Sequence, residues 1–415
     1  MSFLEKLLKG VEVEWKALWE VTIWDKRFNT VDRRKQPKVD NYQYLLAADL
    51  FKLEQSNGDV FLLSTGERIG WTTKELAGAY LREGEVISIP WGKSRPVKDV
   101  LKYYKGLFVT ADNRIATSNN TDILLNKFLF YWLQIQSTLI DGFYRGSGIK
   151  HPNMAAVLDL KIPILPLEIQ KEIVRILDTF AELTAELTAE LTARKKQYNY
   201  YLDNLFNFEQ EEVRWKKLGE IGEFQRGKRF VRTDMLSKGV PCIHYGEMYT
   251  HYSTWANESK SFLSKELVQT KKLRVAEKGD IVIVAAGETI EDLGKGTAWL
   301  GDKGVVIHDA CFSYKSPLNP KYVAYFTRTK QFHDQIKRNI SSGKISAIHA
   351  KGLSTAVIPV PSPEEQERIV SILDKFNILT TSITESLPKE IELRKKQYEY
   401  YRDMLLTFPK DNLKA

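Results

Sequence analysis

Two sequence motifs each occur twice in this chain of 415 residues. The first motif, Gln-x-x-Ile-Val-x-Ile-Leu-Asp-x-Phe, occupies residues 170–180 and again 366–376. The second, Arg-Lys-Lys-Gln-Tyr-x-Tyr-Tyr, occupies residues 194–201 and 394–401, and a shorter match around Trp15 and Trp215 opens each half. A repeat this long is not a solenoid unit. It predicts two whole domains, each followed by a helix, and therefore an internal pseudo-two-fold axis.

The repeat divides the chain into four segments. We expect a first domain at 1–165, a helical spacer at 166–207, a second domain at 208–362 and a C-terminal helical spacer at 363–415. Each domain pattern is α+β: short apolar runs bounded by turn residues predict buried strands, and a helical stretch follows in both. Because residues 3–8 resemble 201–206, the two ends of the chain are expected to lie together.

Apolar residues in each spacer recur at steps of four and three, which is typical of a coiled-coil seam. They are Ile173, Ile176, Phe180, Leu183, Leu187 and Leu191 in the first spacer, and Leu373, Phe376, Leu379 and Ile383 in the second. We expect the two helices to pair antiparallel within the chain. A coiled coil between two chains is the alternative.

The two spacers differ in length. The offset between the copies is 196 at Gln170 and Gln366 but 200 at Arg194 and Arg394, so the second helix has gained one four-residue unit. That unit adds about 6 Å of helical rise. Pro388 is predicted to kink the second helix or to restart it.

Charge and composition narrow the class of protein. The net charge of +8 divides into +4, −2, +7 and −1 over the four segments, so the positive charge lies in the two domains. Two basic modules on acidic spacers favour a polyanion held at two places. Two cysteines, Cys242 and Cys311, are too few for a disulfide framework and favour a reducing cytoplasm. The longest apolar run, 128–133, is too short to span a bilayer, so no membrane is expected.

No catalytic motif is recognisable. A methyltransferase acting on an exocyclic amine would carry an Asn/Asp-Pro-Pro-aromatic tetrad, and Asn319-Pro-Lys-Tyr lacks the second proline, so Asn319 is better explained as a helix N-cap. Residues 287–296 lack the spacing of a phosphate loop. Histidines and cysteines do not have zinc-ligand spacing, and no bound metal is expected.

If the domains bind DNA, the useful residue types are basic and amide side chains for base edges, with further cations and aromatic rings nearby. The candidates in the first domain are Trp91, Lys93, Arg95, Tyr144, Arg145, Ser147, Lys150 and His151. In the second domain they are Arg226, Lys228, Arg229, Arg232, His244, Tyr245, Arg274, Lys344, His349 and Lys351. The clusters differ between the halves while the scaffold repeats, which favours two different half-sites.

Taken together, the paired motifs and the Ala-Glu-Leu-Thr repeats at 181–192 make the chain resemble the specificity subunit of a type I restriction–modification enzyme. The resemblance implies a non-catalytic subunit whose two target-recognition domains each read one half of a split sequence in double-stranded DNA. It implies that the helices set the gap and dock two methyltransferase subunits, and that restriction subunits can join. The resemblance implies no cofactor on this chain; S-adenosylmethionine, ATP and Mg²⁺ would belong to the partner subunits.

Three other functions compete with this interpretation. A stand-alone architectural DNA-binding protein would bind tightly without partners. An enzyme with an unrecognised active site conflicts with the missing motifs. A purely structural coiled-coil adaptor leaves the positive charge of both domains unexplained.

Overall fold

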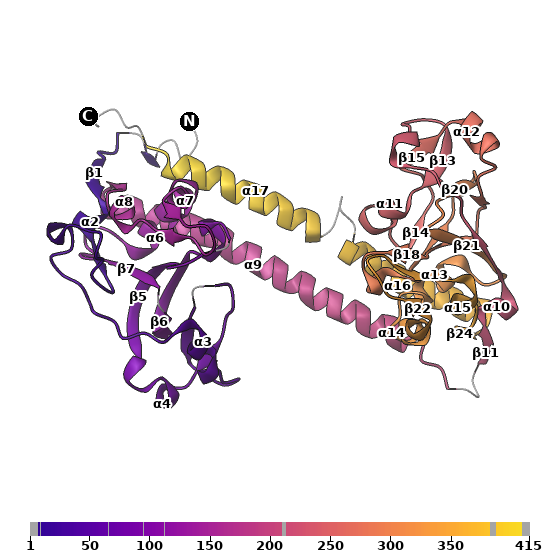
Figure 1. Ribbon diagram of the computed structural model, residues 1–415, viewed down its shortest axis with the longest axis horizontal. Coiled ribbons are helices and arrows are strands. Elements are labelled where there is room, and N and C mark those ends of the chain that lie inside the picture. The colour runs from indigo at the N-terminus through magenta and orange to yellow at the C-terminus, as the bar shows by residue number, and fades with distance from the viewer. Residues whose placement is uncertain are drawn as a thin grey trace. The chain divides into compact units, whose positions relative to one another are not determined.

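The computed structural model describes residues 7–8, 10–64, 66–93, 95–111, 113–209, 213–381 and 387–408, with the backbone alone for 378–381. The chain divides into two compact units (Figure 1). Unit 1 comprises Met1–Thr184 with Leu393–Ala415, and unit 2 comprises Ala185–Glu392. Both ends of the chain thus belong to unit 1, where Leu7 and Leu8 pack in the same apolar cluster as Leu405 and Leu406. The remainder of the segment 3–8 lies outside the described residues.

Unit 1 is built on a mixed sheet with strand order β2-β7-β5-β6-β3-β4. These strands are β2 (Thr22–Trp24), β3 (Val60–Leu63), β4 (Trp71–Thr72), β5 (Arg82–Ile89), β6 (Lys102–Thr110) and β7 (Arg114–Ser118). Shorter pairs are β1 (Glu14–Ala17) with β10 (Lys161–Ile164), and β8 (Tyr144–Arg145) with β9 (His151–Pro152). The helices are α2 (Leu18–Val21), α3 (Ala47–Leu50), α4 (Lys74–Ala77), α5 (Val97–Val100), α6 (Asn126–Ile135), α7 (Ser137–Asp141) and α8 (Met154–Leu158), with 3₁₀ turns η1 (Arg33–Lys35), η2 (Phe51–Leu53) and η3 (Gly78–Tyr80).

Unit 2 repeats the antiparallel strands β2-β7-β5-β6 of that sheet as β12-β21-β17-β19, with β14 parallel next to β19, and has a further sheet of order β15-β13-β20-β16. Its strands are β11 (Arg214–Lys217), β12 (Glu223–Arg226), β13 (Val240–Ile243), β14 (Trp255–Ala256), β15 (Ser261–Leu263), β16 (Val275–Ala276), β17 (Ile281–Val284), β18 (Ala286–Gly287), β19 (Gly296–Trp299), β20 (Val305–Ile307), β21 (Cys311–Lys315), β22 (Ile340–Ser341), β23 (Ser346–Ile348) and β24 (Val357–Val360). Its helices are α10 (Leu218–Ile221), α11 (Tyr245–Thr250), α12 (Lys265–Thr270), α13 (Pro320–Phe326), α14 (Lys330–Ile336) and α15 (Ala350–Ser354), with η4 (Arg232–Asp234), η5 (Ile290–Asp292) and η6 (Lys337–Asn339).

One strand of unit 1 takes the place of two strands in unit 2. The first part of β6 pairs antiparallel with β5 and its last residues pair parallel with β3. In unit 2, β17 pairs antiparallel with β19 on one side and with β21 on the other, whereas the parallel partner of β13 is β20. The mixed α+β class predicted from the sequence is confirmed, and the expected strands and the helical stretches at 127–131 and 321–325 are present in both units.

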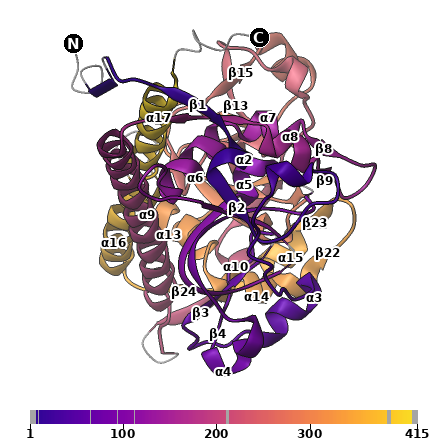
Figure 2. The same cartoon turned by 90° about the vertical axis from the view of Figure 1, so that its left-hand side faces the viewer.

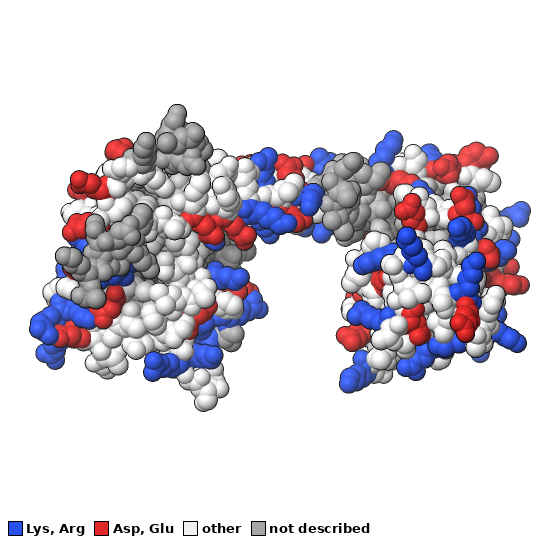
Figure 3. All heavy atoms as spheres, turned by 90° about the horizontal axis from the view of Figure 1, so that it is seen from above, with Lys and Arg blue, Asp and Glu red and all other residues white. Residues whose placement is uncertain are grey.

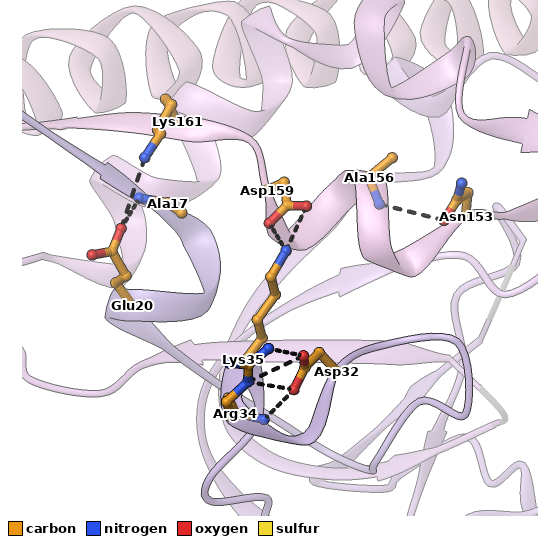
Figure 4. A network of polar contacts seen from close by, with 9 residues as sticks. All are labelled: Ala17, Glu20, Asp32, Arg34, Lys35, Asn153, Ala156, Asp159 and Lys161. Carbon is orange, nitrogen blue, oxygen red and sulfur yellow. Dashed lines mark hydrogen bonds and ion pairs between the residues drawn. The ribbon is translucent and has the colours of Figure 1, made fainter. Parts of the chain in front are cut away.

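Each unit closes on the same entry and exit pair of strands. Trp15 of β1 lies opposite Pro163 of β10, and Trp215 of β11 lies opposite Pro359 of β24. In unit 1 a polar network next to this pair joins η1 to α8, where Lys35 Nζ donates to Asp159 Oδ2 at 2.7 Å (Figure 4).

The spacer helices begin directly after the exit strands, as predicted. They are α9 (Leu167–Asn204), α16 (Pro363–Thr381) and α17 (Leu387–Leu406). Residues 382–386, which separate α16 from α17, lie outside the described residues, so the kink or restart expected at Pro388 stays a prediction.

A buried glutamine fastens each helix to its domain. Gln170 Oε1 accepts from Leu125 N at 3.0 Å, and Nε2 donates to the carbonyls of Ile123 and Leu165. Gln366 repeats this with Asn319 N at 2.9 Å and Pro361 O at 3.0 Å.

A second matched contact lies two turns along each helix. Asp178 accepts from the Tyr131 hydroxyl at 2.5 Å and pairs with Lys127 at 3.2 Å. Its counterpart, Asp374, accepts from Tyr325 at 2.6 Å and pairs with Lys321 at 2.7 Å. These two acids are the Asp of the repeated first motif, so the motif is used as a helix-to-domain anchor in both units.

The repeated aromatic residues also contact one another. In unit 1, where α17 lies beside the first part of α9 (Figures 1 and 2), Phe180 stacks on Tyr401 with ring centroids 5.2 Å apart. In unit 2, Tyr201 of α9 stacks on Phe376 of α16 at 5.0 Å. In each case the Phe of one motif meets a Tyr of the other.

The predicted seam residues differ in how deeply they are buried. Ile173 and Leu373 are fully buried in the unit cores, as is Leu177, which the sequence analysis did not select. Ile176, Phe180, Leu183, Leu187, Leu191 and Phe376 are half-buried. The side chain of Leu379 and the whole of Ile383 lie outside the described residues.

Candidate nucleic-acid interface

Most of the candidates in unit 1 gather around one hairpin, which we call hairpin 1: strands β8 and β9 with the turn 146–150. The loop after β5 lies against it. Lys93 N donates to Lys150 O at 3.1 Å, and the Trp91 ring contacts the His151 ring with centroids 4.1 Å apart. Residues from positions 91–93 and 144–152 therefore form one surface, although some fifty residues separate them in the sequence.

Two of these candidates are interior. The Lys93 side chain is 10% exposed, is paired with Asp141 and lies over the Tyr144 ring. The Tyr144 hydroxyl donates to Pro90 O at 2.6 Å, and burial raises the pKa of this phenol. Both side chains therefore hold hairpin 1 against the sheet.

The remaining candidates of unit 1 face solvent. Hairpin 1 exposes Arg145, Ser147, Lys150 and His151, and the adjoining loop after β5 exposes Trp91. Arg95 is exposed as well, but its guanidinium forms an ion pair with Glu67.

In unit 2 the first group of candidates surrounds a cluster of aromatic rings. His244 lies 4.6 Å from both Tyr245 and His308, measured between ring centroids, and Phe230 contacts both histidines. Since Phe230 lies in the basic segment 226–232, the cluster holds this segment against His244, the N-cap residue of α11.

Most cations of this loop are exposed at the rim of the cluster. Arg226 Nε donates to Asp309 O at 2.9 Å, and Lys228 Nζ reaches Lys271 O at 3.5 Å. The exposed candidates here are Arg226, Arg229, Arg232, Tyr245 and Arg274, while Lys228 is half-buried and His244 is buried.

The last candidates of unit 2 lie on a second hairpin, hairpin 2, which comprises β22, β23 and the turn 342–345. Lys344 is exposed in its turn, His349 precedes α15, and Lys351 is exposed on α15. Strand β18 pairs with β23, so hairpin 2 is attached to the strand that follows β17. Hairpin 1 is attached in the same way to the loop that follows β5.

The two histidines of the aromatic cluster are held neutral. Burial, followed by the nearby His308 and Arg232 charges, lowers the pKa of His244 to about 4, against the opposing effect of Glu247 and Asp309. Burial also lowers the pKa of His308. Nδ1 of His244 accepts a backbone hydrogen bond from Gly246 N, which favours the uncharged form. Nδ1 of His308 accepts from Ala310 N but also lies 2.9 Å from Asp309 Oδ1, and this carboxylate opposes the effect of burial on the pKa.

We expect acid to destabilise unit 2 through these rings. The unfolded chain takes up the His244 proton near pH 6.5 and the folded chain only near pH 4, so stability is lost as the pH falls through this window. Between pH 7.5 and 5 the loss is about 1–2 kcal/mol. Hydrogen-exchange mass spectrometry of peptides from β13 and α11 would measure it.

The matched control is His244→Asn, which retains an acceptor at the N-cap of α11 but does not titrate. In this variant the hydrogen exchange of the β13 and α11 peptides should depend less on pH than in the wild type. Equal pH dependence would show that His244 is not the group responsible. The stability contribution of Asp25 in unit 1 has the opposite pH dependence. Burial raises the pKa of this carboxyl to about 6, so its contribution to stability is present at low pH and is lost as the pH rises from 3.8 to 6.

Several residues of these surfaces were missed by the sequence analysis. His308, Phe230 and Asp141 hold candidates in place, yet an isolated His, Phe or Asp gives no signal in one sequence. Ile149 and Ile345, at the turns of the hairpins, were overlooked because only polar and aromatic types were sought.

Charge on the visible faces is mixed. Lys and Arg are interspersed with Asp and Glu on each unit, and no single basic stripe is seen (Figure 3). Among the described residues there is no group of three or more His, Cys, Asp or Glu side chains that could hold a metal ion. In that same part of the chain, no helix is both long enough and apolar enough to cross a membrane.

Loops that expose cations and aromatic rings on an α+β frame used twice are the arrangement expected of a protein that contacts DNA at two places. Comparison with known proteins gives the class. The model of the type I restriction modification DNA specificity domain matches residues 47–194 and 210–393. The specificity subunit of the type I restriction enzyme EcoR124I/EcoR124II of Escherichia coli is 35% identical over 426 residues, covering 99% of this chain and 98% of the relative. A protein named as a putative type I restriction enzyme specificity subunit, from Haemophilus influenzae, is 31% identical over 422 residues, 98% of each chain. This chain belongs to the type I restriction–modification specificity subunit family.

Solved structures agree with the fold. The S subunit of the type I restriction–modification system of M. genitalium has a TM-score of 0.60 at 17% identity, over 99% of this chain and 100% of that one. A chain from a study of complex assembly and conformational transition in a type I system has a TM-score of 0.53 at 16% identity, over 95% of this chain and 97% of that one.

Proposed function

We propose that the segments 1–165 and 208–362 are target-recognition domains that each read one half of a bipartite DNA site. The segments 166–207 and 363–415 are the spacers between them. The observation that carries this proposal is that one frame is used twice with different loops: the glutamine fasteners, the Tyr–Asp anchors and the hairpins recur, whereas the side chains offered to solvent differ. Two recognition domains with different exposed side chains suit two different half-sites.

The spacers form an antiparallel pair with a pseudo-two-fold axis in this proposal. The reciprocal stacks Phe180–Tyr401 and Tyr201–Phe376 support it, because the residue numbers rise along one helix as they fall along the other. The pair sets the gap between the half-sites, since its length is fixed by the number of helical residues.

The same helices dock two copies of one methyltransferase subunit. Ile173 and Leu373 are buried in the unit cores and the other described seam residues are half-buried, which leaves the opposite face of the helices for a partner. On that face Tyr200 and Tyr400 occupy the same place in the two Arg-Lys-Lys-Gln-Tyr-x-Tyr-Tyr motifs and are 66% and 65% exposed. Two identical exposed aromatic anchors fit two copies of the same partner.

Catalysis then belongs to the partners. This chain carries no cofactor in our proposal; the methyltransferase subunits use S-adenosylmethionine, and restriction subunits that translocate and cut use ATP and Mg²⁺. The chain itself supplies the DNA sequence specificity of the complex.

The deciding experiment is a base-resolution methylome of cells that co-express this chain and its methyltransferase. We expect N6-methyladenine at a split motif, one half of which changes when residues 13–165 are exchanged for those of a relative. Absence of new methylation from an assembled complex would overturn the proposal in favour of a stand-alone architectural DNA-binding protein.

A second expected result concerns the isolated chain. It should bind DNA weakly and with strong salt dependence, because its contacts with phosphate are sequence-independent. Addition of the methyltransferase should raise the preference for the target over a scrambled duplex by at least about tenfold. Fluorescence anisotropy at matched salt measures both, and equal preference with and without the partner would contradict the assignment.

A further inference from the structure

Each recognition domain presents one isoleucine at the turn of its hairpin. Ile149 in the turn of hairpin 1 is 65% exposed, and Ile345 in the turn of hairpin 2 is 64% exposed. One exposed aliphatic side chain is unremarkable on a protein surface. Its recurrence at the equivalent turn of two domains whose other loops differ points to a shared task.

Both turns are held by a fixed base. Hairpin 1 is held by a hydrogen bond from the Tyr144 hydroxyl to Pro90 O and by reciprocal backbone hydrogen bonds between Lys93 and Lys150. Hairpin 2 is held by a hydrogen bond from Ile348 N to Ala285 O and by the pairing of β18 with β23. Each isoleucine is therefore presented by a supported two-stranded ribbon.

The position of Ile149 is also shaped by its neighbours. A Cβ built at Gly92 would lie 2.6 Å from the Ile149 Cγ2 atom, so the Ile149 side chain lies directly against this glycine. One side of Ile149 thus rests on the loop after β5, and the other side is left for a partner.

The surroundings of both isoleucines are cationic. Residues 142–158, which contain hairpin 1, include Arg145 and Lys150 and no Asp or Glu. Residues 335–363, which contain hairpin 2, are also without acidic residues and carry four cations: Lys337, Arg338, Lys344 and Lys351. Arg145, Lys150 and Lys344 are exposed, and none of them has an ion pair within the described part of the chain. This charge selects a polyanion as the occupant of the surface.

A two-stranded ribbon fits the major groove of B-DNA, where phosphates flank the base edges. The apolar group in that groove is the 5-methyl of thymine, which aliphatic side chains contact. We propose that Ile149 and Ile345 each contact the methyl group of a thymine, one in each half-site. The inference rests on the proposed function and adds a base-contacting residue to each domain.

The test uses the purified complex of this chain with its methyltransferase and duplexes that carry the methylome-defined site. Each thymine is replaced in turn by deoxyuridine, which removes only the methyl group. For the wild type, one replacement in the half-site read by residues 1–165 should weaken binding about three- to fivefold, the value of one buried methyl. Ile149→Ala should bind the thymine duplex more weakly and should show no further loss with deoxyuridine.

The two domains serve as each other's controls. Ile149→Ala should leave the deoxyuridine profile of the second half-site unchanged, and Ile345→Ala should leave that of the first unchanged, which also shows that the complex has assembled. Ile149→Val should retain the methyl sensitivity. Leu139→Ala, an equally simple truncation at an exposed site on α7, should keep the wild-type profile.

Three results would overturn the inference: a site that lacks thymine in either half, a wild-type profile without methyl sensitivity, or an Ile149→Ala profile that keeps it. In each case site-specific methylation would persist, and the proposed function would stand. Loss of bipartite methylation in the wild-type complex would instead refute the proposed function itself.

Discussion

Removal of Ala185–Thr188 should abolish methylation of the native site while leaving the two half-site sequences recognisable at a different spacing. These four residues lie inside α9, and all but Leu187 are exposed. The deletion shortens the helix by about 6 Å and rotates its C-terminal part by about 40°. In an aligned active site, a displacement of about 1 Å can lower the reaction rate by about two orders of magnitude. The methylation rate at the native DNA site should therefore fall by at least about 100-fold.

The new target should have a gap shorter by about one to two base pairs, since a base pair rises about 3.4 Å. A methylome of cells expressing the deletion variant measures gap and half-sites together. The control is Thr188→Ala, which alters the same segment without changing its length. Retention of the native gap, or altered bases in either half-site, would contradict the proposed role of α9 as the spacer.

Truncation of Gln170 should have the largest effect on stability. Gln170→Ala removes three hydrogen bonds and leaves Leu125 N and two carbonyls without their partner in a buried place. Each unsatisfied buried group costs about 1–3 kcal/mol, so we expect a loss of about 3–5 kcal/mol in the local free energy of opening. Hydrogen exchange of peptides from α6 and from the start of α9 would report it.

Gln366→Ala should have a smaller effect in unit 2, because Gln366 makes two such hydrogen bonds. Gln197→Ala on the exposed face of α9 is the matched control and should change little. If α6 were protected equally well in Gln170→Ala and Gln197→Ala, the glutamine would not fasten the helix to its domain.

The repeat explains why so much of the fold could be predicted. Because equivalent residues occur in both halves, each structural prediction can be made twice, and the strand predicted at 281–284 supports the one predicted at 84–89. The exit strands in turn locate the start of both helices. The N-cap role of Asn319 was also recognisable, because its side chain accepts from Lys321 N and Tyr322 N as a cap residue does.

The candidate site was less predictable because it depends on contacts between distant residues. Nothing near Lys93 in the sequence indicates that Asp141 neutralises it, and nothing near His244 indicates that His308 lies beside it. Charge and residue type select what could bind DNA, whereas burial decides which side chains are free to do so. DNA contact by the exposed candidates stays a prediction.

The anchoring contacts have a consequence for inheritance. The stretches 170–201 and 366–401 encode nearly the same residues at both ends, and each joins a domain to its helix through a glutamine, an aspartate and a stacked aromatic pair. If the two domains are separate recognition units, as proposed, recombination within either stretch would exchange one domain and keep a glutamine, an aspartate and an aromatic residue at the junction. We expect such crossing over between related genes to replace one half of the recognised sequence in a single step.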